Sequence, residues 1–432
     1  MNKIVIKILC AVFILSFPLT HAGAEETLTW QDCIREAAKN NPDLISASES
    51  VKQSEASKKI TASALYPQLN ANLNASTSGT STIGEDSGDK ISQTNDSYSY
   101  GATASQLIFD GFKTLNNVKA AGQNINAAKE NYRFVSTDVR LNLRSAFINL
   151  LRTQEFVQVA EEIIKIRRGN LELITLRYQS GFEHRGALLT AEANLAEANY
   201  ELSQAKRGVV LAQRQLTKAM GRKEFVPMSA QGDFTVVDTA KVKPDYDELI
   251  KNNPSILQAA AKSNAAAYNI KSTYASFYPS INGQAQANKS GSHWSPQNDQ
   301  WNLGLNLSLP IFEGGLRLAQ VSQAKASYNQ AVADERSIRD GVIVSLEQAW
   351  VVLQDALEQV DVQYKNLIAT EERSKIAEAE YSTGFISYDN WTIIEDNLVS
   401  AKKSYLNSQI AAMLAEANWI QVKGETLEYA KN

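Results

Sequence analysis

Two parts of this 432-residue chain carry the same pattern. The motif Ile-Phe-Asp-Gly at residues 108–111 returns as Ile-Phe-Glu-Gly at 311–314, an offset of 203 residues (311 − 108). At the same offset, Tyr-Gln-Ser-Gly-Phe at 178–182 returns as Tyr-Ser-Thr-Gly-Phe at 381–385. A long internal repeat predicts that the fold is built from two similar units.

The repeat also extends upstream of these motifs. Asn-Asn-Pro at residues 40–42 returns at 252–254, and Tyr-Pro at 66–67 returns at 278–279, both at an offset of 212 residues (252 − 40). The nine-residue difference between the offsets (212 − 203) indicates an insertion in the first copy, between Pro67 and Ile108.

Residues 1–24 have the pattern of a cleavable secretory signal. Lys3 and Lys7 precede an apolar run from Ile8 to Leu19, and Ala-Gly-Ala follows at 22–24. We expect the mature chain to begin at residue 25. An uncleaved membrane anchor is the alternative, but the apolar run is shorter than the roughly 20 residues that span a bilayer.

The composition argues against two classes of protein. The formal net charge is −4, and it becomes −6 once the two lysines of the signal are removed (−4 − 2), which disfavours a nucleic-acid partner. Cys10 leaves with the signal, so Cys33 is unpaired and a disulfide framework is excluded. Cys33 also lies away from the cleavage point, where a lipoprotein needs its acylated cysteine.

Each copy contains two segments in which polar and apolar residues alternate, which is the pattern of a strand with one wet and one apolar face. We expect strands at about 67–77 and 98–109 in the first copy, and at about 279–289 and 301–312 in the second. The polar Gly/Ser/Asp-rich stretch at 76–97 is predicted to be a loop.

A very long helix is predicted after each pair of strands. Residues 111–178 and 314–381 contain no proline and show helical periodicity throughout. Each interval of 67 residues (178 − 111 and 381 − 314) corresponds to roughly 100 Å of helix, which must pack against other long helices.

A heptad helix follows each long helix, at about 187–220 and 388–422. In the first, Leu or Val recurs every seven residues, with Ala every seven residues between them, so the helix axes can approach closely. The apolar positions are Leu188, Leu195, Leu202, Val209 and Leu216, and the alanines are Ala191, Ala198, Ala205, Ala212 and Ala219. In the second copy the same seam runs from Trp391 to Val422 with larger residues.

The domain organisation follows from these elements. Residues 25–221 form the first repeat and 251–424 the second, and 425–432 form a C-terminal tail. The connector at 222–250 contains Pro227 and Pro244, a short β-like stretch at 234–237 and no periodicity.

Four strands of about ten residues are long enough to cross a bilayer when tilted, but they are too few to close a barrel. Open sheet edges are not tolerated in lipid, so we expect the chain to oligomerise. Three copies give twelve strands, enough for an aqueous lumen. Polar residues would line this lumen and aromatic residues would mark the interfaces. The lumen residues are Asn70, Asn72, Asn74, Asn302, Asn306 and Ser308, and the aromatic residues are Tyr66, Tyr98, Tyr100, Tyr278, Trp294 and Trp301.

The duplicated order of helix, Tyr-Pro, strand pair, Ile-Phe-(Asp/Glu)-Gly, long helix, Tyr-x-x-Gly and heptad helix resembles the TolC-like outer-membrane efflux proteins. The resemblance covers essentially the whole mature chain. It implies a mainly α fold with a membrane β-barrel contribution, arranged as a homotrimer with a 12-stranded barrel and a long α-helical periplasmic barrel. It further implies a passive exit duct for efflux or type I secretion in a Gram-negative outer membrane, where a periplasmic adaptor links the duct to an inner-membrane pump.

The turns at Gly181-Phe182 and Gly384-Phe385 join each long helix to the next, so they should form the far tips of the tunnel. The resemblance implies that these tips contact the adaptor. A helix-terminating glycine followed by an apolar residue needs no partner, and this is the alternative.

The resemblance also implies a periplasmic gate, and here the match is partial. The gate tyrosine is kept as Tyr381, but the usual threonine and aspartate fall on Gly186 and Ala187, and the usual arginine falls on Ile386. The two lumen aspartates fall on Asn390 and Ile393, so the charged latch is missing. Nearby groups that offer a substitute are Glu183, Arg185 and Asp389, although a solvated helix turn explains them equally well.

The sequence gives little support for an enzyme. The mature chain has two histidines, His184 and His293, and neither has a cysteine or carboxylate at metal spacing. No phosphate-binding glycine motif is present, and we expect no catalytic residue, metal or cofactor. The acidic residues at 85–89 resemble a fragment of a calcium loop but lack its alternating oxygen ligands.

Two other functions compete with an export duct. An adhesive or structural coiled-coil surface protein would also use long heptad helices and a cleavable signal, but it does not need two amphipathic strand pairs. A passive porin would not need two helices of roughly 100 Å. The identity of the exported substrate and the class of pump would depend on the adaptor and pump.

Overall fold

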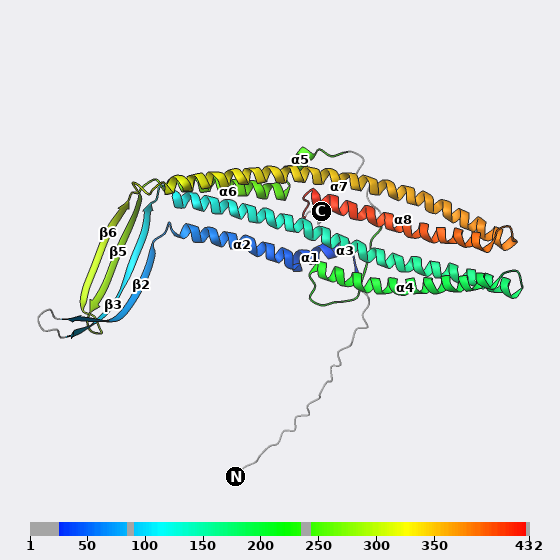
Figure 1. Cartoon of the computed structure of the whole chain (residues 1–432), viewed down its shortest axis with the longest axis horizontal. Helices are drawn as coiled ribbons and strands as arrows, with labels where there is room; N and C mark the ends of the chain where they lie inside the picture. The colour runs from blue at the N-terminus through cyan, green and yellow to red at the C-terminus, as the bar shows by residue number, and fades with distance from the viewer. Residues whose placement is uncertain (1–25, 84–89, 235–242, 429–432) are drawn as a thin grey trace, which may run out of the picture.

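The computed structural model describes residues 26–83, 90–234 and 243–428. The described chain is elongated, with a sheet at one end and two helical hairpins at the other (Figure 1). The predicted signal peptide and the acidic stretch at 85–89 lie outside the described residues. Among the helices that are described, none combines the length and apolar character that crossing a membrane requires.

Two long helices run along the body. They are α3 (Lys113–Gln179, 67 residues) and α7 (Leu316–Thr383, 68 residues). Each turns back at a hairpin tip into α4 (Arg185–Met220) or α8 (Tyr388–Val422). Most of the alanines of the predicted heptad seam of α4 are buried, and α4 packs against α3.

The half of the body nearer the sheet is completed by shorter helices. Helices α2 (Pro42–Ser63) and α6 (Pro254–Ala275) have 22 residues each and occupy equivalent places in the two copies. Asn41 and Asn253 cap them by accepting hydrogen bonds from backbone N–H groups, and a proline stands in each first turn. Helix α1 (Trp30–Asn40) precedes α2.

The sheet contains four antiparallel strands in the order β2-β3-β5-β6. Their bounds are Gln68–Ile83, Lys90–Phe109, Ser280–Gly291 and Asn298–Ser308. The predicted loop at 76–97 is wrong in most of its length, because Ser76 to Ile83 pair with Ser97 to Lys90. Strand β6 ends at Ser308, before the predicted residue 312, because Pro310 has no N–H group to continue the ladder.

The register gives the sheet two different faces. Asn70, Thr103, Gln286 and Asn302 lie side by side across the four strands. The next row on the other face consists of Leu69, Ala104, Ala285 and Leu303. The sheet therefore has one polar face and one apolar face, as the alternation predicted.

The connector between the copies lies beside the middle of the helices. It contains β4 (Met228–Ala230), which pairs in parallel with β1 (Glu26–Leu28), and α5 (Tyr246–Ile250). Of the predicted β-like stretch at 234–237, Phe234 is not in a strand, and 235–237 lie outside the described residues. Arg222 holds the connector to the N-terminal segment by ion pairs with Glu26 and Glu36.

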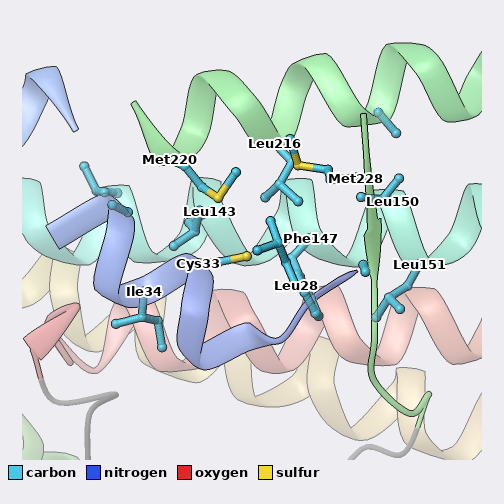
Figure 2. Packing of buried hydrophobic residues seen from close by; sticks show 14 of the residues in the cluster. Leu28, Cys33, Ile34, Leu143, Phe147, Leu150, Leu151, Leu216, Met220 and Met228 are labelled. Carbon is cyan, nitrogen blue, oxygen red and sulfur yellow. The ribbon is translucent and has the colours of Figure 1, made fainter. Parts of the chain in front are cut away.

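The largest buried cluster lies in the same middle region, where α1 packs on α3 and α4 (Figure 2). Cys33 is fully buried there, beside Leu143, Phe147 and Leu216, and forms no disulfide. Leu427, near the C-terminus, belongs to the same cluster, so the end of the described chain is packed into the core.

Candidate functional site at the helix tips

Both hairpin tips lie at the end of the molecule opposite the sheet (Figure 1). Gly181 and Gly384 adopt positive φ angles of 75° and 85°, which allow each long helix to end abruptly. The next residue donates its N–H to a carbonyl five residues back, from Phe182 to Arg177 and from Phe385 to Glu380, at 2.8 Å in both cases. The two tips therefore have the same backbone geometry.

The phenylalanines of the tips face outward. Phe182 is 76% exposed and Phe385 is 83% exposed. A residue in this position usually packs back against its own helix to cover apolar surface. Because neither ring does so, local helix termination does not explain why both copies carry phenylalanine.

Tyr381 lies one turn before the second tip and is almost fully buried, with 1% of its surface exposed. Its ring stacks on Trp391 of α8, with 4.5 Å between centroids and 8° between planes. Tyr388 lies against both rings. Ile174 and Ala187 from the first copy complete this cluster, so it joins the α3/α4 hairpin to the α7/α8 hairpin.

The hydroxyl of Tyr381 donates a 2.8 Å hydrogen bond to Oε2 of Glu183, in the turn between α3 and α4. The Arg177 guanidinium lies 4.8 Å from the centroid of the tyrosine ring. Burial, together with the Glu183 carboxylate, raises the pKa of Tyr381 above its ordinary value. The tyrosine is therefore protonated at neutral pH and acts as the donor.

The other predicted gate residues divide into two groups. Ala187 is buried in the cluster around Tyr381, and Ile386 packs against its edge. The remaining four are exposed on the surface of this chain, with Ile393 at 58%. These four residues are Gly186, Asp389, Asn390 and Ile393.

Charged contacts that the sequence analysis missed connect α8 to the first hairpin. Arg167, a buried residue of α3, bonds Asp396 at 2.5 Å. Lys402 bonds Glu162 of α3 at 2.9 Å, and Lys403 bonds Glu201 of α4 at 2.7 Å. One feature of the sequence indicated such a contact: Arg167 is a charged residue on a helix face that is otherwise apolar.

A groove of about 690 Å³ lies between α3, α7 and α8, next to the tyrosine cluster. Glu395 is buried at its wall and accepts a 2.5 Å hydrogen bond from Ser374. Lys165 and Glu378 also line the groove, so its wall carries both signs of charge.

The described residues contain no group of three or more His, Cys, Asp or Glu side chains arranged to hold a metal ion. His184, one of the two histidines considered as a ligand, caps α4 instead. Its Nδ1 accepts a hydrogen bond from the N–H of Ala187 at 3.1 Å.

Comparison with known proteins relates the chain to efflux channels. "Cation efflux system protein CusC" of Escherichia coli K12 is 24% identical over 401 residues, covering 89% of this chain and 83% of the relative. "Outer membrane efflux protein BepC" of Brucella suis is 25% identical over 344 residues, covering 78% and 71%.

Solved structures show the same fold. A crystal structure of CusC aligns with a TM-score of 0.79 at 22% identity and covers 90% of this chain and 91% of that one. The open state of the Neisseria gonorrhoeae MtrE outer membrane channel aligns with a TM-score of 0.79 at 20% identity, covering 93% and 90%. The family model for outer membrane efflux proteins matches residues 33–222 and 246–424, which is most of both copies. The chain therefore belongs to the outer membrane efflux protein family.

Proposed function

We propose that three copies of this chain form a passive exit duct across the outer membrane and into the periplasm. Each copy contributes four strands to a 12-stranded barrel, and its long helices contribute to a tunnel. In this proposal residues 25–221 and 251–424 are two equivalent structural repeats joined by the connector 222–250. The observation that carries it is the sheet, which has one polar face, one apolar face and two strands, β2 and β6, that each pair on one side only among the described residues.

The helices support the same assembly. Near the sheet, neighbouring helices follow the order α2-α3-α6-α7, and near the tips the order is α4-α3-α8-α7. Helix α7 therefore forms one edge over its whole length, while α2 and α4 form the other. Both edges expose apolar side chains, including Val344 and Val362 on α7, Ile60 on α2 and Leu211 on α4. Large exposed apolar surfaces of this kind are typical of interfaces.

The two hairpin tips indicate which proteins the duct would bind. We propose that a periplasmic adaptor contacts Gly181-Phe182 and Gly384-Phe385, and that this adaptor couples the duct to an energised inner-membrane pump. Two exposed phenylalanines with the same backbone geometry support this, because an adaptor that bound both tips would meet the same surface twice.

The gate is proposed to lie just above the tips. The tyrosine cluster would hold the two hairpins together through the hydrogen bond between Tyr381 and Glu183 and through packing of Ala187 and Ile386. The exposed positions Gly186, Asp389, Asn390 and Ile393 would then face the lumen or a neighbouring copy. The family's usual aspartate is replaced here by Ala187, which cannot accept a hydrogen bond. Glu183 would accept the hydrogen bond from Tyr381 in its place.

The assembly is tested by extracting the protein in mild detergent and measuring its mass by light scattering. We expect a mass three times that of one chain, mixed α and β circular dichroism, and ion-conducting pores in planar bilayers. A monodisperse monomer that keeps its β signal would contradict the proposal. A stable oligomer without conductance would instead favour a structural or adhesive role.

A further inference from the structure

The groove of about 690 Å³ between α3, α7 and α8 has a buried carboxylate in its wall. Glu395 of α8 is 4% exposed, and it accepts a hydrogen bond from the hydroxyl of Ser374, a neutral group. Among the described residues, no Lys, Arg or His side chain forms an ion pair with Glu395. Buried carboxylates are normally paired with a cation, because burying a charge without one is costly. Glu395 therefore gives the groove an acceptor suited to a cationic ligand.

A buried donor lies on the same helix. Trp391 also lines the groove, is 2% exposed and stacks its ring on Tyr381. Its Nε1–H has no hydrogen-bond partner in the described part of the chain. Buried donors without an acceptor are rare in native proteins, and each costs about 1–3 kcal/mol. Trp391 precedes Glu395 by one helical turn, about 6 Å along the axis, so one small ligand can meet both groups.

The other walls of the groove combine apolar surface with an excess of negative charge. Leu173 of α3 and Leu398 of α8 supply apolar side chains. The charged residues that line the groove are three glutamates, one of which is Glu378 of α7, and Lys165 of α3. Lys165 is exposed, so it can remain in water when a ligand is bound. A ligand with an apolar body and a positive charge matches these walls.

We propose that this groove binds a small organic cation that has a protonated amine at one end, an apolar body, and an oxygen acceptor at the other end. The ammonium group donates to Glu395, and the oxygen accepts from Nε1 of Trp391. Every wall of the groove belongs to one chain, and the contact between α3 and α8 lies inside the helix order α4-α3-α8-α7. The site therefore does not depend on the proposed trimer or on its role as a duct.

Three related compounds test the two contacts separately, by isothermal titration calorimetry on the detergent-solubilised protein with detergent alone as the blank. Tyramine carries an amine and a phenolic oxygen at opposite ends of one ring, phenethylamine lacks the oxygen, and 4-ethylphenol lacks the amine. We expect tyramine to bind, phenethylamine to bind roughly threefold more weakly, and 4-ethylphenol roughly tenfold more weakly, because a hydrogen bond to a charged group contributes more than a neutral one. Equal affinities, or no binding of tyramine, would overturn the proposal.

Substitutions then assign the two contacts to residues. Glu395→Gln keeps an acceptor for Ser374 but removes the charge, and it should weaken tyramine binding roughly tenfold. The matched control is Glu192→Gln, because Glu192 is the equivalent residue of the first copy, at the offset of 203, and is exposed. This control should bind tyramine as the parent does.

The donor is tested by Trp391→Phe, which keeps an aromatic ring at this position. It should lower the affinity for tyramine to that for phenethylamine and leave phenethylamine binding unchanged. Circular dichroism of each variant shows whether the fold is retained. A folded Glu395→Gln protein that binds tyramine as tightly as the parent would contradict the proposal. If that variant does not fold, equal losses of tyramine and phenethylamine binding in Trp391→Phe would contradict it instead.

Discussion

The ring of Tyr381 stacks on that of Trp391 while its hydroxyl reaches Glu183 in the other hairpin, at 2.8 Å. One side chain thus takes part in an aromatic cluster on its own hairpin and in a polar contact with the other. The side chain of Glu183 is only 11% exposed; its Oε2 accepts from this hydroxyl and its Oε1 accepts from the N–H of His184 at 3.3 Å. This hydroxyl therefore adds a polar contact between the two hairpins to the apolar packing of Ile174 and Ala187 against the same cluster.

Removing that hydroxyl should destabilise the closed state of the proposed periplasmic gate. Tyr381→Phe keeps the stacked ring but removes the donor to Oε2 of Glu183, at a cost of about 1.5–3 kcal/mol for a hydrogen bond to a charged group. We expect the open state to become more populated, which single-channel recording would show as a higher open probability.

The internal repeat supplies a control for this variant. Tyr178 is the equivalent residue in the first copy, and it is exposed. Tyr178→Phe should leave the open probability unchanged. Equal open probabilities for Tyr381→Phe and the unmodified protein would show that the hydrogen bond does not restrain the mouth.

The exposed rings of the tips should be required for export. Changing Phe182 and Phe385 together to Asp would place charges at an apolar contact, where their desolvation cost is not recovered. Export measured in cells should be lost, while the amount of trimer in the outer membrane stays the same. Changing both residues to Leu, which keeps apolar surface, should retain most of the activity. Full export by the aspartate variant would exclude the tips as the docking surface.

Most of the fold could be predicted because each repeated motif forms its structure for a physical reason that is visible in the sequence. Gly181 and Gly384 end helices by adopting positive φ, and the absence of proline allowed the two long helices. The residues at 76–97 were mispredicted because serine, threonine and glycine are typical of loops. In the structure residues 76–83 and 90–97 extend a ladder that Asn74 and Ser99 already belong to, and tertiary pairing outweighs their local preference.

The site was harder to predict than the fold. Tyr381 and the tips could be found from the repeat, but the acceptor of the Tyr381 hydroxyl could not be chosen from sequence, because two carboxylates, Glu183 and Asp389, both lie near a hairpin tip. The choice depends on which side chain the turn directs toward the cluster. Trp391 was recognised only as part of a heptad seam, since nothing in the sequence shows that its ring stacks on Tyr381.

The buried Cys33 offers a probe of folding. Burial raises the pKa of its thiol to about 12, because the thiolate loses its hydration in the apolar core. At pH 8 the thiol should therefore react with a thiol reagent only when the protein unfolds. Labelling followed by absorbance should be negligible in detergent and complete in guanidinium chloride. Rapid labelling of the native trimer would mean that the core around α1 opens readily.

The last prediction concerns multivalent cations at the mouth. Asn390 and Ile393 stand at the exposed positions where the family resemblance places lumen aspartates, so the ring of six carboxylates, two from each of three proposed chains, is missing. Without that concentrated negative potential, a trivalent cation has no tight site at the constriction. Micromolar trivalent cations on the periplasmic side should therefore reduce single-channel conductance only weakly. Asn390→Asp with Ile393→Asp should introduce strong block, whereas Asn390→Gln with Ile393→Leu should not. Tight block of the unmodified pore would mean that another carboxylate, with Asp389 the nearest, lines the lumen in place of these two residues.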